Sequence, residues 1–396
     1  MRCLTVSGLI LLCLSLLACQ SKQQQAERAL AKRGTPLTAE AFLQSAREGD
    51  LEKLQLFLQA DMDVNAADAN GDTAFCAAVG ARQKSAADFL LQHGANIDAQ
   101  NLAGQTPLLI AVTNGDIEWL HYLLDAGANP NLADHENRTP LTATNDVGIL
   151  TTLLHAGAQP DERGIQGQPP IVWAVAVKDL EMVNELLDNG ANPDTPANSP
   201  ASNSFVAVVG ERTLEYYLIK DRGITPLMVA AGQDNLDMVK LLLERGAKKT
   251  LKTGRSATPA IYIACVNHHT SVIQTLLGKD PERQPWRISI SLAKQRLTVT
   301  RDGKVWLTSP ISSGAKNFET PRGEFVVTNK NEEWFSNLYD NAPMPFFMRL
   351  NCSPVGLHAG ALPGYPASHG CIRLPHANAE KIFQNVDIGT VVTIGD

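Results

Sequence analysis

Positive charge, clustered metal ligands and long apolar runs are all scarce in this chain of 396 residues. The net charge is −7, so the composition does not indicate a protein that binds nucleic acid. The seven cysteines and nine histidines form no Cys-x-x-Cys or His-x-x-x-His pair, the spacings typical of metal sites. We therefore expect no nucleic-acid partner and no bound metal. Apart from residues 4–17, no stretch is long and apolar enough to hold the chain in a membrane.

The first nineteen residues differ in character from the rest. Arg2 precedes the apolar run of residues 4–17, which is too short to span a bilayer, and small Ala18 precedes Cys19. This segment resembles the lipobox of bacterial lipoprotein signal peptides, in which the cysteine is acylated and the peptide is cut before it. An ordinary secretory signal is the alternative. With Gln20 next in the chain, the resemblance implies a periplasmic protein that is lipid-anchored at Cys19 to the outer membrane.

A polar segment without aromatic residues, 20–37, is predicted to be a tether. Residues 38–280 then repeat, and Thr73, Thr106 and Thr139 are 33 residues apart. The stretch "GQTPLLIAVTNGDIEWLHYLLDAGANPN" closely resembles an ankyrin repeat. We expect about seven units, each of two short antiparallel helices that bury their apolar faces only by stacking. The resemblance implies a protein partner for the array.

One segment, residues 198–220, interrupts the repeat. Two β-branched and aromatic runs, 205–209 and 214–219, flank a short polar stretch, and this pattern predicts a β-hairpin. Such an apolar ribbon is marginal alone in water, so it must cover something. Either it packs on the array beside the unit that begins at Thr139, which is three residues short, or it presents Tyr216 and Tyr217 to a partner.

The residue pattern changes near Pro285, where the repeat stops, and residues 286–396 alternate between apolar and polar side chains. Asp302-Gly303 is a hairpin signal between "RLTVT" and "KVWLT". "GEFVVTNK" and "GTVVTIGD" are further strand-like runs, and "HANAEKIFQNV" is the one helix-like stretch. We predict a mostly-β terminal domain.

This domain carries a recognisable signature in "PVGLHAGALPGYPASHGCIRLP", with "TPRGEF" upstream and "GTVVTI" downstream. It resembles the L,D-transpeptidase catalytic domain, whose signature is a histidine, a spacer and then Ser/Thr-His-Gly-Cys. The spacer from His358 to Cys371 is thirteen positions, at the short end for the family. The expected fold class is therefore an all-α ankyrin-repeat solenoid followed by a mostly-β L,D-transpeptidase domain.

The signature pairs a thiol with an imidazole. A cysteine attacks a carbonyl as the thiolate, and an ordinary thiol is mostly protonated near neutral pH. His358 lies on a separate segment and is the candidate to take the proton from Cys371. The resemblance likewise implies that Cys371 is the nucleophile and His358 the general base and acid.

The neighbours of the cysteine have predicted supporting roles. His369 is two residues from Cys371, so in an extended strand both side chains would point to one face. Gly370 permits close approach of the substrate, and its N–H and that of Cys371 are candidate oxyanion donors. Arg373 offers a fork for a substrate carboxylate, with a structural salt bridge or carbonyl clamp as the alternative. Ser368 is expected to orient the turn.

Three other interpretations of the cysteine stay open. His358, His369 and Cys371 could bind zinc. Cys352 and Cys371 could form a disulfide. The domain could be inactive and only bind the cell wall.

The resemblance implies peptidoglycan stem peptides as substrate. Cys371 would attack the carbonyl of diaminopimelate, expel D-alanine and form a thioester, with no cofactor. The acceptor amine could belong to a second stem, to a protein or to a D-amino acid, whereas water would make the enzyme an L,D-carboxypeptidase. The alternative from another class is a non-catalytic scaffold that binds the wall and uses the ankyrin array for protein interaction.

Overall fold

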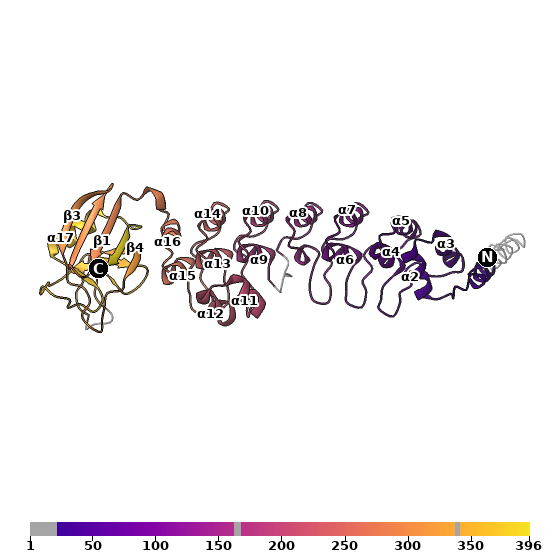
Figure 1. Cartoon of the computed structure of the whole chain (residues 1–396), viewed down its shortest axis with the longest axis horizontal. Coiled ribbons are helices and arrows are strands. Elements are labelled where there is room, and N and C mark those ends of the chain that lie inside the picture. The colour runs from indigo at the N-terminus through magenta and orange to yellow at the C-terminus, as the bar shows by residue number, and fades with distance from the viewer. Residues whose placement is uncertain (1–21, 162–167, 337–340) are drawn as a thin grey trace, which may run out of the picture. The chain divides into compact units, whose positions relative to one another are not determined.

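The computed structural model describes residues 22–161, 168–336 and 341–396 (Figure 1). The predicted lipidation site, Cys19, lies outside these ranges. Two compact units divide the chain, residues 1–170 with 188–190, and residues 171–187 with 191–396, and each is described by itself. Within the described ranges, no helix combines the length and the apolar character needed to cross a membrane.

The first unit consists of paired short helices. They are α2 (Ala39–Glu48), α3 (Leu51–Gln59), α4 (Ala74–Gly80), α5 (Lys84–Gln92), α6 (Pro107–Thr113), α7 (Ile117–Asp125), the 3-10 helix η1 (Leu141–Ala143) and α8 (Val147–His155). The second unit continues the pairs and then changes to a sheet. Its helices are α9 (Pro170–Ala176), α10 (Leu180–Asp188), α11 (Asn203–Val209), α12 (Arg212–Lys220), α13 (Pro226–Gly232), α14 (Leu236–Glu244), α15 (Ala260–Val266), α16 (Thr270–Leu276), η2 (Pro281–Arg283) and α17 (His376–Asn385).

Threonines and glycines of the repeat set the ends of these helices. The Oγ1 of Thr106 caps α6 by accepting from the N–H of Leu109 at 3.1 Å, and Pro107 occupies the first turn, where a missing N–H costs nothing. The glycines that follow the second helices have φ between +88° and +92°, at Gly94, Gly127, Gly157, Gly190 and Gly246. That conformation carries no Cβ penalty for glycine, so a glycine can end the second helix of each of these units.

The unit that begins at Thr139 has lost most of its first helix. Only η1 remains there, and Thr139 and Thr142 bond to each other through their side chains at 3.1 Å. The three missing residues therefore shorten the first helix, while the second helix α8 keeps its Asp146 cap.

The β-hairpin predicted for residues 198–220 is wrong, because the segment forms α11 and α12. Its buried side chains are spaced four residues apart, as Phe205 with Val209 and Leu214 with Leu218, which is the period of a helix face and not of a strand. Ser202 caps the start of α11, and Gly210 ends it at φ +70°. Local β propensity was outweighed by the burial of one face of each helix.

These two helices pack on the repeats, beside α13 (Figure 1). The side-chain amide of Gln233, after α13, donates to the carbonyl of Ala176 in α9 at 2.9 Å and to that of Val209 in α11 at 3.0 Å. Gly232 leaves the space that Leu214 fills, since a Cβ there would lie 2.6 Å from the Leu214 side chain. The segment thus packs on the array, as one of the two alternatives held, through contacts with α9, α13 and α15. The place expected for it beside the unit that begins at Thr139 stays a prediction.

Part of the predicted tether is also structured. Residues 22–32 are helical, and Ala26 and Leu30, one helical turn apart, are buried. Arg33, just after this helix, pairs with Glu52 of α3 at 2.9 Å. Burial of this apolar pair stabilises a helix despite the polar composition of the segment. Residues 22–32 of the predicted tether are therefore folded.

The C-terminal domain is built on one eight-stranded mixed sheet in the order β3-β2-β1-β8-β4-β5-β6-β7. The strands are β1 (Trp286–Ser291), β2 (Arg296–Arg301), β3 (Lys304–Pro310), β4 (Gly323–Asn331), β5 (Phe347–Leu350), β6 (Gly356–Ala359), β7 (Ile372–Leu374) and β8 (Val391–Gly395). Pairs β1–β8 and β6–β7 are parallel and the rest antiparallel. The helix α17 packs on β6. The predicted fold class is confirmed.

Candidate active site

Strands β6 and β7 bring together the histidine, the cysteine and the arginine of the signature. In their parallel register His358 lies opposite Arg373. Side chains alternate along a strand, and Cys371 is two residues before Arg373, at the entry to β7. His358, Cys371 and Arg373 therefore lie toward one face of the sheet.

The thiol of Cys371 is partly buried. Its Sγ donates to the carbonyl oxygen of Pro354 at 3.7 Å, and it accepts from the N–H of Gly356. Burial raises the pKa of Cys371, whereas that N–H and the positive charges of Arg373 and Arg349 act in the opposite direction and only reduce the rise. At neutral pH the group is a thiol.

His358 is buried, with 6% of its surface exposed. Its Nδ1 lies 2.8 Å from the carbonyl oxygen of Ala359. A carbonyl can only accept, so Nδ1 carries the proton and Nε2 keeps a lone pair. Burial is the main cause that lowers the pKa of His358 to about 4, and the like charge of Arg373 acts in the same direction. The hydrogen bond to the Ala359 carbonyl raises the pKa and only partly offsets these two effects. The imidazole is therefore a neutral base at physiological pH.

The turn before Cys371 is fixed from two sides. Ser368 is buried, and its hydroxyl donates to the carbonyl oxygen of Cys371, which agrees with the orienting role predicted for it. The carbonyl of Gly370 accepts from the hydroxyl of Thr320 at 2.9 Å, and that hydroxyl accepts from the N–H of Gly314 at 2.8 Å. Thr320 belongs to the "TPRGEF" stretch that marked the family, but only the fold shows that it contacts the cysteine turn.

His369 does not share the geometry expected for it. Gly370 has φ +102°, so the chain is not extended between His369 and Cys371, and the alternation argument fails there. His369 is exposed, and its ring packs edge-on against Phe318 at 4.6 Å between centroids.

Arg373 is held through its backbone, which exchanges two hydrogen bonds of 3.0 Å with Ser312. Within the parts of the chain that the structure describes, no carboxylate lies within ion-pair distance of its guanidinium. Its positive charge acts to lower the pKa of both His358 and Cys371. Arg349 is a second cation near Cys371 that the sequence did not single out, and it lies over the rings of Trp334 and Phe347.

Two of the other interpretations of the cysteine, the zinc site and the disulfide with Cys352, find no support in this geometry. Over the described residues no three His, Cys, Asp or Glu side chains gather as metal ligands, so His358, His369 and Cys371 do not form a zinc set. Cys352 and Cys371 are both free thiols.

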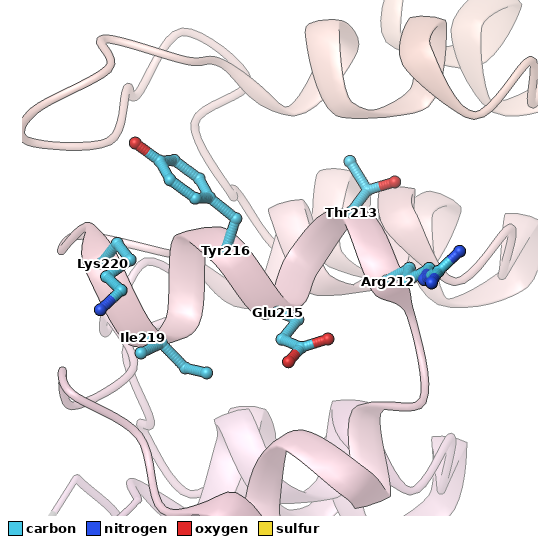
Figure 2. A pocket seen from close by; sticks show the side chains of 6 residues that line it. All are labelled: Arg212, Thr213, Glu215, Tyr216, Ile219 and Lys220. Carbon is cyan, nitrogen blue, oxygen red and sulfur yellow. The ribbon is translucent and has the colours of Figure 1, made fainter.

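A separate hollow of about 530 Å³ lies on α12 (Figure 2). It is lined by Arg212, Thr213, Glu215, Tyr216, Ile219 and Lys220. Tyr216 is 54% exposed and meets Tyr217 edge-on at 5.4 Å. The aromatic pair considered as a partner site is thus at the surface of α12, although the segment as a whole packs on the repeats.

Comparison with known proteins agrees with both parts of the chain. Residues 285–394 match the L,D-transpeptidase catalytic domain (YkuD). Residues 42–134 and 204–285 match the three-copy ankyrin family, and 166–198 match a single ankyrin repeat.

Individual relatives each cover one part. An ankyrin repeat-containing protein named in Treponema pallidum is 32% identical over 44% of this chain and 49% of its own length. A Bacillus licheniformis protein named as an L,D-transpeptidase, YkuD, is 30% identical over 29% of this chain and 69% of its own. A solved L,D-transpeptidase from Mycobacterium smegmatis is 23% identical over 28% of this chain and 59% of that one, with a TM-score of 0.27.

The chain thus spans about half the length of the Treponema relative and under two thirds of the mycobacterial structure. Through its C-terminal domain, which follows a region of ankyrin repeats, the chain belongs to the YkuD family of L,D-transpeptidase catalytic domains.

Proposed function

We propose that this protein is a peptidoglycan L,D-transpeptidase that works through an acyl-enzyme on Cys371. The observation that carries the proposal is the parallel register of β6 and β7, which sets His358 opposite Arg373 with Cys371 two residues away. This arrangement lies inside a domain of the L,D-transpeptidase family, so a thiol, a neutral base and an arginine without an ion-pair partner among the described residues converge where the family's chemistry is expected.

The proposed reaction starts from two uncharged groups. As Cys371 Sγ attacks the carbonyl carbon of diaminopimelate, Nε2 of His358 takes the thiol proton. The tetrahedral intermediate collapses when the C–N bond to the terminal D-alanine breaks, and the imidazolium returns the proton to the leaving amine. A thioester remains. An acceptor amine then attacks it, His358 takes the amine proton and returns it to the thiolate, and the amide product leaves.

Charge stabilisation would come from two sources. The N–H groups of Gly370 and Cys371 are proposed to bind the oxyanion, because Gly370 at φ +102° turns the backbone just before the nucleophile. Arg373 would bind a stem-peptide carboxylate, since no ion pair engages it in the described residues.

The acceptor is not defined by these residues. A second stem gives a cross-link, a protein amine gives or reverses wall attachment, and water gives an L,D-carboxypeptidase. A non-catalytic wall-binding scaffold is the competing function, and the Tyr216 hollow on α12 is what favours a protein-interaction role for the repeats.

We also propose the setting of the enzyme. Acylation at Cys19 would anchor it to the outer membrane, with the body in the periplasm next to the wall. The ankyrin repeats would hold a protein partner there.

The proposal is tested by intact mass and product analysis. The full chain is incubated with a carbapenem, and separately with disaccharide-tetrapeptides whose products are identified by mass. We expect one covalent adduct and new muropeptides for the wild type, neither for Cys371→Ser, and strongly slowed acylation for His358→Ala. Cys76→Ala, a buried cysteine outside the domain, is the matched control and should behave as wild type.

Two outcomes would count against the proposal. Turnover retained in Cys371→Ser would remove the acyl-enzyme. Wall binding by the wild type with neither adduct nor product would favour the scaffold.

A further inference from the structure

Two cysteines that the reaction does not use meet between the last repeat and the catalytic domain. Cys265 lies in α15 and is 2% exposed, whereas Cys352 lies in the loop between β5 and β6 and is partly exposed. Both belong to the second compact unit. The two side chains lie close enough for each to act on the pKa of the other, so this approach joins segments far apart in the sequence.

Other contacts hold the two segments together. The residue before Cys352 is Asn351, whose side-chain amide lies 3.2 Å from Nδ1 of His268, just after α15. The ring of His268 also packs edge-on against Phe325 of β4 at 5.1 Å. Further along, the buried side-chain amide of Gln274 in α16 donates to the carbonyl of Gly389 at 2.7 Å. The cysteines therefore meet inside a packed and hydrogen-bonded interface.

The loop presents Cys352 in a defined position. Asn351 and Cys352 both have positive φ, +43° and +55°, a conformation uncommon for residues with a side chain. The N–H of Cys352 donates to the hydroxyl of Thr328 at 3.1 Å, and Oδ1 of Asn351 accepts from the N–H of Val326 at 2.7 Å. These two hydrogen bonds to β4 thus hold the backbone of Asn351 and Cys352 in its uncommon positive-φ conformation.

The two thiols are chemically unequal. The interaction with Cys265 lowers the pKa of Cys352, helped by the Thr328 hydroxyl and the charge of Arg349, against the opposing effect of burial. The same contact, together with burial, raises the pKa of Cys265. Because the thiolate is the reactive form, the more exposed Cys352 is the one suited to react first.

We propose that Cys265 and Cys352 are a redox pair that forms a disulfide linking the last ankyrin repeat to the catalytic domain. The oxidant is a disulfide, either oxidised glutathione or the disulfide of a protein thiol oxidase. The thiolate of Cys352 attacks one sulfur of that disulfide and expels a thiolate, giving a mixed disulfide.

In the second step Cys265 attacks the sulfur of Cys352, transfers its proton to the departing thiolate and displaces it. In total two thiols of the protein are oxidised by two electrons, and one external disulfide is reduced to two thiols.

This pairing leaves the candidate nucleophile in its reduced form. Cys371 contacts Pro354 and Gly356 rather than Cys352, so the Cys352–Cys371 disulfide considered from the sequence has no counterpart in this geometry. Pro354 is two residues after Cys352 in the same loop. A link from Cys265 to Cys352 would therefore restrain the loop that borders the Cys371 thiol.

The test uses the full chain equilibrated with oxidised glutathione, quenched in acid and alkylated before non-reducing peptide mapping. We expect a peptide that joins Cys265 to Cys352 as the main oxidised species, with Cys371 alkylated. The bridge closes a loop of roughly ninety residues, so the melting temperature should rise by roughly 5–15 °C on oxidation.

Two variants make the result specific. Cys352→Ser, in a partly exposed loop, should lose both the linked peptide and the rise in melting temperature. Cys76→Ala, a buried helix cysteine of another repeat, should keep both. The proposal is overturned if Cys352 is recovered linked to Cys371, or if Cys265 and Cys352 are both recovered unlinked after equilibration. The second outcome does not bear on whether Cys371 is the nucleophile, whereas a Cys352–Cys371 link would also block that thiol.

Discussion

At the scale of single residues, the candidate site is an uncharged pair. Burial favours the neutral form of each group, which lowers the pKa of His358 to about 4 and raises that of Cys371. A thiolate–imidazolium pair would need the opposite shifts. The chemistry should therefore begin with a proton transfer coupled to attack, and the positive charges of Arg373 and Arg349 would then stabilise the developing negative charge.

This electrostatic arrangement predicts an unusual pH profile. His358 loses its basic form only as the pH falls through about 4, well below the ordinary histidine value. We expect kcat/KM for acylation to stay flat from about pH 8 to about pH 5, measured by single-turnover mass spectrometry with a carbapenem. A loss of about fivefold between about pH 6.5 and about pH 5.5 would mean that the base has an ordinary pKa of about 6.5.

A second residue-scale prediction concerns Arg373. Its backbone is held by Ser312 whatever the side chain is, so Arg373→Gln should fold normally. We expect KM for the tetrapeptide to rise by roughly tenfold or more, because a charge-assisted bidentate contact is lost, with a smaller change in kcat. Arg296→Gln, an exposed arginine on β2, is the control. Equal kinetics for the two variants would show that Arg373 does not bind substrate.

At the scale of elements, α11 and α12 are an insertion that became part of the core. Phe205, Leu214 and Leu218 are almost fully buried, and each such side chain is worth about 1.5–3 kcal/mol when buried. A glycine is needed at position 232 beside them, because a Cβ there would lie 2.6 Å from the Leu214 side chain. The segment is therefore structural first, and any binding role is limited to its exposed face.

Deleting the segment should destabilise the protein. With Ala197 joined directly to Asp221, we expect a fall in melting temperature of at least about 5 °C, since the apolar face and the two Gln233 hydrogen bonds are lost. Thermal unfolding followed by circular dichroism measures this. Tyr216→Ala, at a side chain 54% exposed, should leave the melting temperature unchanged. An unchanged melting temperature in the deletion would instead favour a segment kept for binding.

At the scale of the whole molecule, the chain combines a repeat region with a catalytic domain that contacts its last repeat. Gln274 to Gly389, and His268 to Asn351 and Glu324, are polar links between them. A partner bound to the last repeat would therefore lie next to the domain that carries Cys371.

The anchor is the prediction that belongs to this scale. If acylated Cys19 holds the protein, Cys19→Ala should move it from the membrane fraction to the soluble fraction, because acyl chains supply the membrane affinity. Cys13→Ala, within the same leader, should stay with the membrane. Fractionation with a high-salt wash and immunoblotting decides between them. Membrane retention of Cys19→Ala would show that another feature attaches the protein.

The sequence alone was enough to predict the repeats, the mostly-β terminal domain and the signature that contains His358 and Cys371. These features depend on local spacing, such as the 33-residue period and the hairpin at Asp302-Gly303. Local patterns of this kind can be identified without knowledge of the fold. Segment 198–220 could not be assigned in the same way, because its β-branched runs fit a strand while burial against α13 selects a helix. The helix at residues 22–32 was missed for another reason, because the polar composition of the segment hides the apolar pair Ala26 and Leu30 that is buried in the fold.

Only the tertiary structure decided how distant segments meet. The register of β6 and β7, the hydrogen bond of Thr320 to the cysteine turn and the protonated Nδ1 of His358 all depend on strand order and burial. The partner of Cys352 is the clearest case. The sequence left Cys371 open as one possible partner, whereas the contacts of α15 and His268 with the domain bring Cys265 near it, because thiol pairing depends on distance in space and not on separation along the chain.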